Sequence, residues 1–165
     1  MYKTITGLVC GYFDIFHAGH VHFLKSAQDA IQKKAAEITV SNYAELDISL
    51  CYANLIVALA GDRSLKFQKG EDRPYMPVDQ REVILKACRY VDAVHTYEPM
   101  EDIYDVDQYH GHRKLIAEIT PDYFIHSRQT PHTHLTEILE EFDVKPLYVD
   151  SINIHTTNLM SGWRK

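Results

Sequence analysis

The feature that most constrains the fold is an uninterrupted apolar run at residues 55–60, with the sequence LIVALA. A strand with one face in water alternates apolar and polar residues, and this run does not alternate. It is therefore expected to be a strand covered on both faces, as in a parallel sheet with helices on either side. Gly61 and Asp62 follow the run and are expected to end the strand.

Short strand-like and amphipathic segments alternate along the rest of the chain. Residues 4–10 (TITGLVC) predict a first strand, and the helical spacing of apolar residues predicts a helix from Ala18 to about Lys34. The same criteria predict helices at 78–90, 112–119 and 135–142, and strands at 91–95, 123–126 and 146–149. Alternating strands and helices favour right-handed βαβ units, so we predict an α/β fold: a Rossmann-like open parallel sheet with helices on both faces.

The length of 165 residues, 45% of them hydrophobic, suits a single domain over residues 1–165. Residues 35–52 show no clear periodicity, and we interpret them as an insertion between the first helix and the second strand. Nothing else resembles a linker.

Charge and cysteine content exclude several classes of partner. The net charge of −6 provides no global field that would hold nucleic acid or an anionic membrane. The three cysteines are far apart and lie among apolar residues, which favours reduced thiols in a cytosolic protein. The N-terminus lacks a signal-peptide pattern, and no apolar run approaches the roughly 20 residues needed to span a bilayer. We therefore expect a cytoplasmic protein that binds neither membranes nor nucleic acid.

Residues 11–20 (GYFDIFHAGH) follow the first predicted strand, where ligands bind in open α/β sheets. Gly11 and Gly19 allow the backbone to approach a ligand closely. A helix that begins near Ala18 directs free N–H groups at this place, which suits phosphate. His17 and His20 are three residues apart and would face the same way. Two imidazoles there can donate hydrogen bonds to a polyphosphate and to charge developing at a phosphorus atom.

This segment resembles the HxGH signature of the nucleotidyltransferase superfamily, Gly-x-Phe-Asp-x-x-His-x-Gly-His, and matches it at every fixed position. The resemblance is to cytidylyltransferase-like domains, closest to the heptose-phosphate adenylyltransferase and glycerol-3-phosphate cytidylyltransferase type. It implies that His17 and His20 are catalytic. It also implies that the nucleotide is bound by Gly11, Tyr12, Phe13, Asp14 and Gly19. Asp14 would position a metal ion or, in the alternative, fix the turn through backbone hydrogen bonds.

Residues 66–74 (KFQKGEDRP) are similar to the Lys-Gly…Arg-Pro segment of the same enzymes. On a flexible loop, Lys66 would bind the triphosphate and Lys69 would assist catalysis. Arg81, on the following helix, would bind the phosphate of the acceptor. The alternative is a solvated basic loop.

Residues 154–160 (IHTTNLM) resemble the family's late Ser-Thr-Thr signature, with His155 in place of serine. His155, Thr156 and Thr157 would hold the distal phosphates at a helix N-terminus. Residues 125–130 (IHSRQT) replace the family's Gly-Gly-Asp or Gly-Asp-Asp segment, which lies near the base and the acceptor. Arg128 is predicted to bind the acceptor, or else to be an exposed loop arginine.

The resemblance implies a reaction. An acceptor phosphate oxygen attacks the α-phosphorus of a nucleoside triphosphate, ATP or CTP, and pyrophosphate leaves. The acceptor would be a phosphorylated small molecule such as a sugar- or polyol-phosphate. Mg²⁺ is the implied cofactor, bridging the triphosphate, with no protein metal site predicted. Relatives imply a homodimer.

Two other readings stay open. The chain has ten histidines, including His-x-His pairs at 20–22, 110–112 and 132–134, which would suit a transition-metal binding protein. The replacements at His155 and at residues 126–130 would suit a nucleotide-binding module that has lost turnover. A dinucleotide-dependent dehydrogenase is disfavoured, because no GxGxxG follows the first strand.

Overall fold

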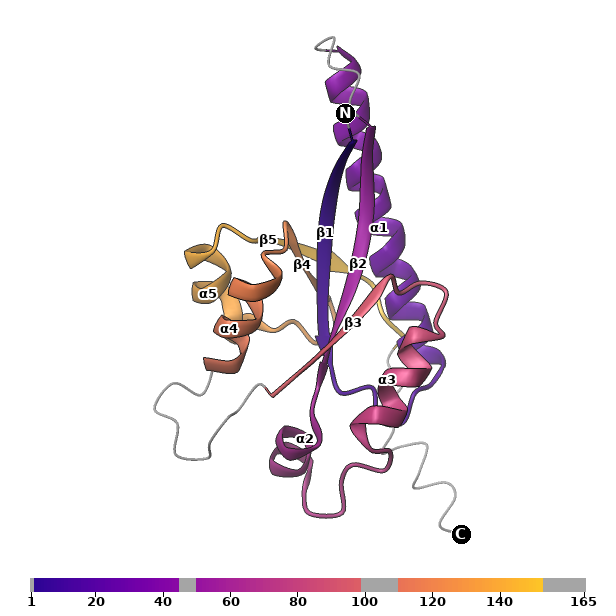
Figure 1. Cartoon of the computed structure of the whole chain (residues 1–165), viewed down its shortest axis with the longest axis vertical. Coiled ribbons are helices and arrows are strands. Elements are labelled where there is room, and N and C mark those ends of the chain that lie inside the picture. Colours follow the sequence, from indigo (N-terminus) through magenta and orange to yellow (C-terminus); the bar gives the residue numbers. More distant parts are fainter. Residues whose placement is uncertain (1, 45–49, 99–109, 153–165) are drawn as a thin grey trace.

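The structure is a computed structural model that describes residues 2–44, 50–98 and 110–152. These residues form a five-stranded, fully parallel sheet with the strand order β3-β2-β1-β4-β5 (Figure 1). The strands are β1 (Tyr2–Gly11), β2 (Leu50–Ala60), β3 (Ala93–Tyr97), β4 (Tyr123–Ser127) and β5 (Lys145–Val149). The α-helices are α1 (Ala18–Ala44), α2 (Asp62–Lys69), α3 (Val78–Lys86), α4 (His110–Ile119) and α5 (Thr136–Glu141), and a 3₁₀ turn, η1 (Thr133–Leu135), precedes α5. The predicted α/β class is confirmed.

Strand β2 has both faces buried, as its uninterrupted apolar run predicts. It lies between β1 and β3. Leu55, Val57 and Leu59 belong to the core on one face of the sheet, and Ala58 belongs to the core on the other. Because successive side chains of a strand point to opposite faces, a strand with a core on each side needs apolar residues at every position.

Two hydrophobic cores cover the sheet, one on each face. In Figure 1, α1 and α3 lie to one side of the sheet and α4 and α5 to the other. Leu24 and Ile31 of α1 and Leu85 of α3 pack in the first core. Leu115 of α4 and Ile138 of α5 pack in the second. All five side chains are at most 2% exposed, so both cores are closed to water.

The prediction that the first helix ends near Lys34 is wrong, because α1 continues to Ala44. The extension is stabilised by tertiary contacts: Ala35 is buried in the first core and Ile38 packs against it. The Thr39 hydroxyl accepts a hydrogen bond from the backbone N–H of Cys51 at 2.9 Å. The stretch interpreted as an insertion is therefore mostly a longer helix followed by the start of β2, and residues 45–49 lie outside the described residues.

The expected flexible loop after β2 is also corrected, because residues 62–69 form helix α2. Leu65 is fully buried, and the backbone N–H and hydroxyl of Ser64 both donate to Glu98 just after β3. Gly70 ends the helix with φ at 108° and ψ at 166°, a conformation that only glycine adopts easily. Anchoring at Ser64 and Leu65 makes a helix of a segment whose composition suggested a loop.

The strand order places a topological switch point between β1 and β4. From β1 the chain builds the sheet outward through β2 and β3, and later on the opposite side through β4 and β5. In open α/β sheets, ligands bind in the crevice beyond the carboxyl ends of the strands at such a point. The turn after Gly11 and the segments after Ser127 and Val149 should therefore meet there.

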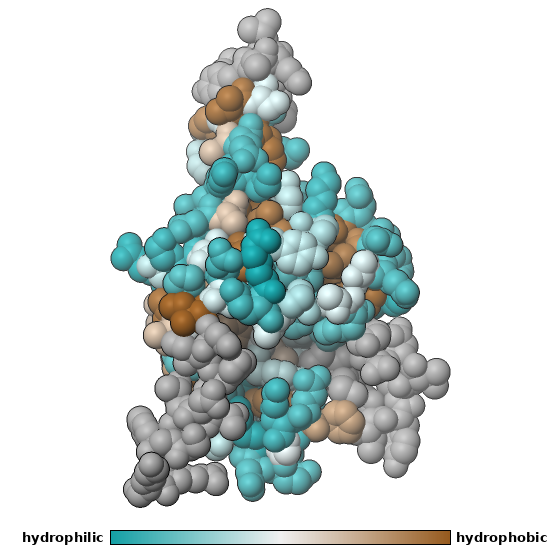
Figure 2. Space-filling model, turned by 180° about the vertical axis from the view of Figure 1, so that it is seen from behind, coloured by the Kyte–Doolittle hydropathy of each residue, from teal (hydrophilic) through white to brown (hydrophobic). Residues whose placement is uncertain are grey.

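The outer surface contrasts with these cores. Figure 2 shows mostly hydrophilic residues over the middle of the molecule, with separate hydrophobic patches on both sides and toward the narrow end, where α1 ends and β1 and β2 begin. Tyr2, Val40 and Tyr52 in these elements are 76%, 70% and 51% exposed. Within the described residues, none of the helices combines the length and apolarity needed to cross a membrane.

Candidate active site

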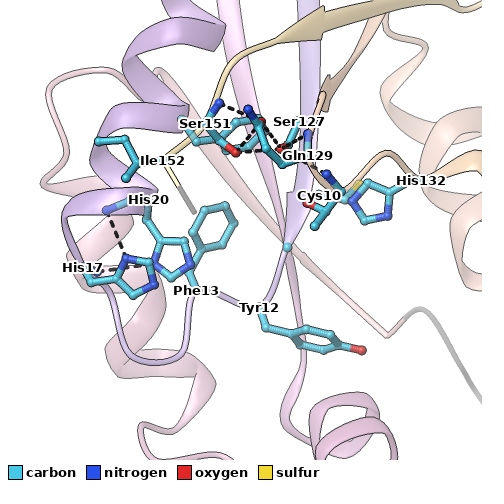
Figure 3. Close-up of a pocket in the computed structure, with 14 residues that line it drawn as sticks. Cys10, Tyr12, Phe13, His17, His20, Ser127, Gln129, His132, Ser151 and Ile152 are labelled. Atoms are coloured by element: carbon cyan, nitrogen blue, oxygen red, sulfur yellow. Dashed lines mark hydrogen bonds between the residues drawn. The ribbon is translucent and has the colours of Figure 1, made fainter. Parts of the chain in front are cut away.

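A cavity of about 250 Å³ opens at the switch point, beyond the carboxyl ends of β1, β4 and β5 (Figure 3). Its lining comes from the turn after β1, the start of α1 and the segments after β4 and β5. The lining residues are Cys10, Gly11, Tyr12, Phe13, His17, Gly19, His20, Phe23, Ser127, Gln129, Thr130, His132, Ser151 and Ile152. Six residues of the predicted histidine motif or its nucleotide-binding set are therefore brought together in one cavity, with Asp14 outside its lining.

The turn after β1 folds back over the end of the strand. Phe13 has φ at 53° and is buried, with its ring centroid 5.0 Å from that of His20. A Cβ atom on Gly11 would come within 2.8 Å of the Phe13 ring. Gly11 is therefore needed because the aromatic ring occupies the space that a side chain would fill.

His17 and His20 form a stacked pair at the start of α1. Their ring centroids are 3.8 Å apart and the ring planes differ by 18°. The His17 Nδ1 accepts the backbone N–H of Gly19 at 3.1 Å, and the His20 Nδ1 accepts the backbone N–H of His17 at 3.3 Å. Since each Nδ1 is an acceptor, each neutral ring carries its proton on Nε2. Both rings line the cavity.

Burial and the neighbouring His17 lower the pKa of His20 from 6.5 to about 3. The His20 ring is therefore neutral at neutral pH, because burial disfavours its charged form. A neutral donor binds an anion without losing a proton to it. The pair is suited to hydrogen-bond phosphate oxygens rather than to act as a general base.

Asp14 fixes a different segment from the one expected. Its buried carboxylate accepts hydrogen bonds from Arg73 Nε at 2.9 Å and from the backbone N–H groups of Tyr75 and Met76 at 3.0 and 2.9 Å. These contacts attach the segment before α3 to the turn after β1. Of the two roles considered for Asp14, fixation of backbone through hydrogen bonds agrees with the geometry. The backbone that it fixes is that of Tyr75 and Met76, which lie 61 and 62 residues further along the chain. The positioning of a metal ion by Asp14 stays a prediction.

Arg81 does not occupy the position expected of an acceptor ligand, and this prediction is corrected. The side chain is only 1% exposed. Its guanidinium donates to the carbonyl oxygens of Tyr12, Ala60 and Met76 at 2.6–2.9 Å, and to the Asp62 carboxylate at 2.6 Å. Four of the five N–H groups of an arginine are thus used internally. Arg81 ties together the end of β1, the end of β2, the start of α2 and the segment before α3.

The other predicted cations also lie apart from the cavity lining. Lys66 and Lys69 are on α2, and Lys66 forms an ion pair with Glu71 at 2.6 Å. Arg128 is exposed, with its Nε 3.5 Å from Asp150. Among the lining residues that the structure describes, there is no lysine or arginine. The predicted phosphate-binding residues His155, Thr156 and Thr157 lie outside the described residues.

Sequence reasoning named the segment 125–130 on the opposite wall but selected only Arg128 from it. Ser127 is the last residue of β4, Gln129 and Thr130 follow this strand, and Ser151 follows β5. Ser127, Gln129, Thr130 and Ser151 were not selected, since no motif marks these residue types. His132 also lines the cavity.

His132 belongs to a cluster of four histidines, which we call the histidine cluster: His112, His126, His132 and His134. Successive ring centroids are 5.5 to 6.1 Å apart. Burial, followed by the neighbouring histidines, lowers the pKa of His112, His126 and His132 to about 4. Across the described residues, no group of three or more histidine, cysteine or acidic side chains has the geometry to hold a metal ion. The cluster gives no support to the metal-binding alternative.

Comparison with known families identifies the family of this chain. A family profile described as "Cytidylyltransferase-like" matches residues 8–162, almost the whole chain. The chain belongs to the cytidylyltransferase-like family. This family consists of nucleotidyltransferases.

Curated relatives agree with this assignment. The chain is 36% identical over 115 residues to the bifunctional protein HldE of Yersinia enterocolitica, an alignment that covers 70% of this chain and 18% of the relative. It is 36% identical over 120 residues to the FAD synthase of Pyrococcus horikoshii, covering 73% of this chain and 60% of the relative. HldE of Photorhabdus laumondii is 31% identical over 92% of this chain and 26% of its own length. The chain thus spans less than two thirds of each of these relatives.

Solved structures share the fold. The lipopolysaccharide core biosynthesis protein of Thermoplasma volcanium superposes with a TM-score of 0.59 at 18% identity, over 90% of this chain and 98% of the other. Pantoate-beta-alanine ligase of Francisella tularensis superposes with a TM-score of 0.51 at 12% identity, over 97% of this chain and 69% of the other. At these identities the likeness supports the Rossmann-like fold alone.

Proposed function

We propose that this chain transfers a nucleotidyl group from ATP or CTP to a phosphorylated small molecule and releases pyrophosphate. The observation that carries the proposal is the stacked pair His17 and His20, whose rings line a cavity at the switch point of the sheet. The N-terminus of α1 adds the positive end of its helix dipole at the same place. Hydrogen-bond donors fixed in advance around a phosphate are what this reaction requires.

In the proposed reaction, an oxygen of the acceptor phosphate forms a bond to the α-phosphorus. The bond from this phosphorus to the oxygen that bridges to the β-phosphate breaks, and pyrophosphate leaves with the electron pair. The attacking oxygen is already ionised near neutral pH, so no general base is needed. Catalysis then depends on alignment and on stabilisation of negative charge, which His17 and His20 provide as neutral donors.

The cations on α2 have an assisting role in this proposal. Lys66 and Lys69 lie on the helix that follows β2, and long lysine side chains can reach a bound triphosphate from outside the described lining. His155, Thr156 and Thr157 are proposed to hold the distal phosphates. The test is Lys69→Ala compared with Lys33→Ala on the exposed surface of α1: only the first should raise the KM for the triphosphate.

Mg²⁺, a homodimer and a cytoplasmic location stay predictions. Since no carboxylate is among the described lining residues, Mg²⁺ would be held by phosphate oxygens of the triphosphate rather than by this part of the chain. Activity should disappear with a chelator and return with added Mg²⁺. Sedimentation equilibrium should give the mass of two chains.

The proposed acceptor is a sugar- or polyol-phosphate. The relatives named HldE and FAD synthase favour nucleotide transfer without fixing the acceptor for this chain. The decisive experiment measures pyrophosphate release from ATP and CTP with a panel of sugar phosphates, polyol phosphates and flavin mononucleotide. Nucleotide binding without pyrophosphate release from any combination would favour the module that has lost turnover.

A further inference from the structure

The wall of the cavity opposite the histidines carries a hydrogen-bonded group formed by Ser127, Gln129 and Ser151. Figure 3 shows these three residues together, on another side of the cavity from His17 and His20. Gln129 Oε1 lies 3.0 Å from the backbone N of Ser151, 2.9 Å from the Ser151 hydroxyl and 3.2 Å from the Ser127 hydroxyl. The two hydroxyl oxygens are also 2.7 Å apart.

These contacts fix which end of the Gln129 amide faces the serines. A backbone N–H can only donate, so the atom that meets the Ser151 N–H must be the amide oxygen and not the amide nitrogen. Each hydroxyl has one hydrogen, and one of the two serines donates to the other, so the oxygen accepts the Ser151 N–H and one hydroxyl, which occupy its two lone pairs. It therefore has no capacity left for a ligand. The two N–H groups on Nε2 form no hydrogen bond within the described part of the chain, and Gln129 lines the cavity.

The amide is thus a donor without acceptor capacity. A free glutamine can accept from an amino group and donate to a ring nitrogen at once, but the oxygen of Gln129 is already bound. Its partner must be an acceptor atom such as a ring nitrogen, a carbonyl oxygen or a sugar oxygen. The proposed function assigns the phosphates to the wall of His17 and His20, which leaves the wall of Gln129 for the nucleoside. A volume of about 250 Å³ lies below the roughly 300–1,000 Å³ usual for ligand pockets, so the cavity encloses only the part of the triphosphate between these two walls.

We propose that Gln129 is a specificity-determining residue that donates its amide N–H groups to an acceptor atom of the nucleoside part of the bound triphosphate. Ser127 and Ser151 are positioning residues, because they hold the amide oxygen and so orient the nitrogen. This inference rests on the proposed function, since it assumes that the phosphates lie at His17 and His20.

The experiment compares two substitutions of Gln129. Gln129→Met removes the donors without adding charge, and Gln129→Glu keeps an oxygen for the serines while replacing the donor by an acceptor. We expect both to raise the KM for the preferred triphosphate by roughly tenfold or more, because a polar ligand atom loses its partner. Inhibition by inorganic tripolyphosphate and the KM for the acceptor should stay unchanged in Gln129→Met. Gln32→Glu, exposed on α1, adds the same charge elsewhere and should behave as the wild type.

Two results would overturn the inference. The KM for the triphosphate could be unchanged in Gln129→Met, whether or not the charged Gln129→Glu variant changes it, or the acceptor KM could rise instead. Should Gln129→Met fail to fold, Ser151→Ala replaces it, with a smaller rise in the same KM expected. Failure of the proposed function is a different result: the wild-type chain would then release no pyrophosphate from any triphosphate.

Discussion

At the scale of single residues, the stacked histidines show how packing sets a protonation state. His20 is held between Phe13, Phe16 and His17, and its pKa of about 3 keeps the ring neutral at any pH at which the enzyme would work. The backbone N–H donated to Nδ1 then leaves the proton on Nε2. A pair of imidazoles becomes a pair of neutral donors through geometry alone.

Two substitutions of His20 should separate the effect of its hydrogen-bond donor on activity from the effect of its aromatic ring. In His20→Gln the amide nitrogen lies near the former Nε2, whereas in His20→Asn it cannot reach that position. We expect His20→Asn to lower kcat by about 10²–10³-fold, the usual loss for one fixed donor, and His20→Gln to lower it less. Steady-state pyrophosphate release measures both, with the thermal unfolding temperature as the check on folding. Equal activity in all three proteins would contradict the assigned role.

Arg81 is the second residue whose role follows from its partners. Arg81→Lys keeps the charge but cannot reach three carbonyl oxygens and a carboxylate at once, because lysine lacks the planar fork of arginine. We expect Arg81→Leu to reduce the free energy of unfolding by about 3–5 kcal/mol, because the three carbonyl oxygens around this buried side chain lose their donor. Arg81→Lys should also be destabilising. Urea unfolding tests this; wild-type stability together with a raised acceptor KM would instead restore the acceptor-binding interpretation.

At the scale of elements, α2 shows how a polar segment becomes ordered. The helix begins after Gly61, is anchored by Leu65 and by the contacts of Ser64 with Glu98, and ends at Gly70. Helices of eight residues are marginal by themselves, so these tertiary contacts decide its structure.

Gly70→Ala tests the end of α2. A Cβ atom there would meet nothing within 4 Å, so any effect arises from the backbone conformation and not from a clash. We expect a loss of about 1–3 kcal/mol in the free energy of unfolding, because φ of 108° with ψ of 166° is strained for alanine. The control is Lys86→Ala at the end of α3, which should be close to neutral. A neutral Gly70→Ala would show that this end of α2 relaxes freely.

At the scale of the whole molecule, buried histidines couple stability to pH. His112, His126 and His132 have folded-state pKa values of about 4, below the unfolded value near 6.5. Between these values the unfolded chain binds more protons than the folded chain, so stability falls as the pH falls. It should be fully present above about pH 6.5 and decrease progressively toward pH 4.

Thermal unfolding between pH 8 and pH 4 measures this dependence. His126→Asn provides a matched variant, since an asparagine oxygen can still accept the backbone N–H of His132 that now meets His126 Nδ1. The variant removes one titrating ring, so its unfolding temperature should fall less steeply with acid than that of the wild type. A pH profile that is flat from 8 to 4 would contradict the assigned environments.

The sequence alone determined the local and repeating features of this protein. The unbroken apolar run at 55–60 required a strand buried on both faces, and the alternation of strands and helices required a parallel sheet. The spacing of His17 and His20 in a glycine-flanked turn after the first strand identified the candidate site. Each of these follows from residues close together in the chain, where geometry is set by bonded neighbours.

Only the tertiary structure decided the roles that depend on distant partners. Arg81 matched a ligand pattern, but three carbonyl groups from other elements surround its guanidinium and make it a structural tie. Lys66 and Lys69 were expected on a loop, and burial of Leu65 made that loop a helix. Gln129 carried no motif, and it became the most informative residue of the opposite wall only because the serines after β4 and β5 hold its oxygen. The physical reason is the same in each case: a polar side chain takes its role from the donors and acceptors that the fold brings to it, and those come from residues far away in sequence.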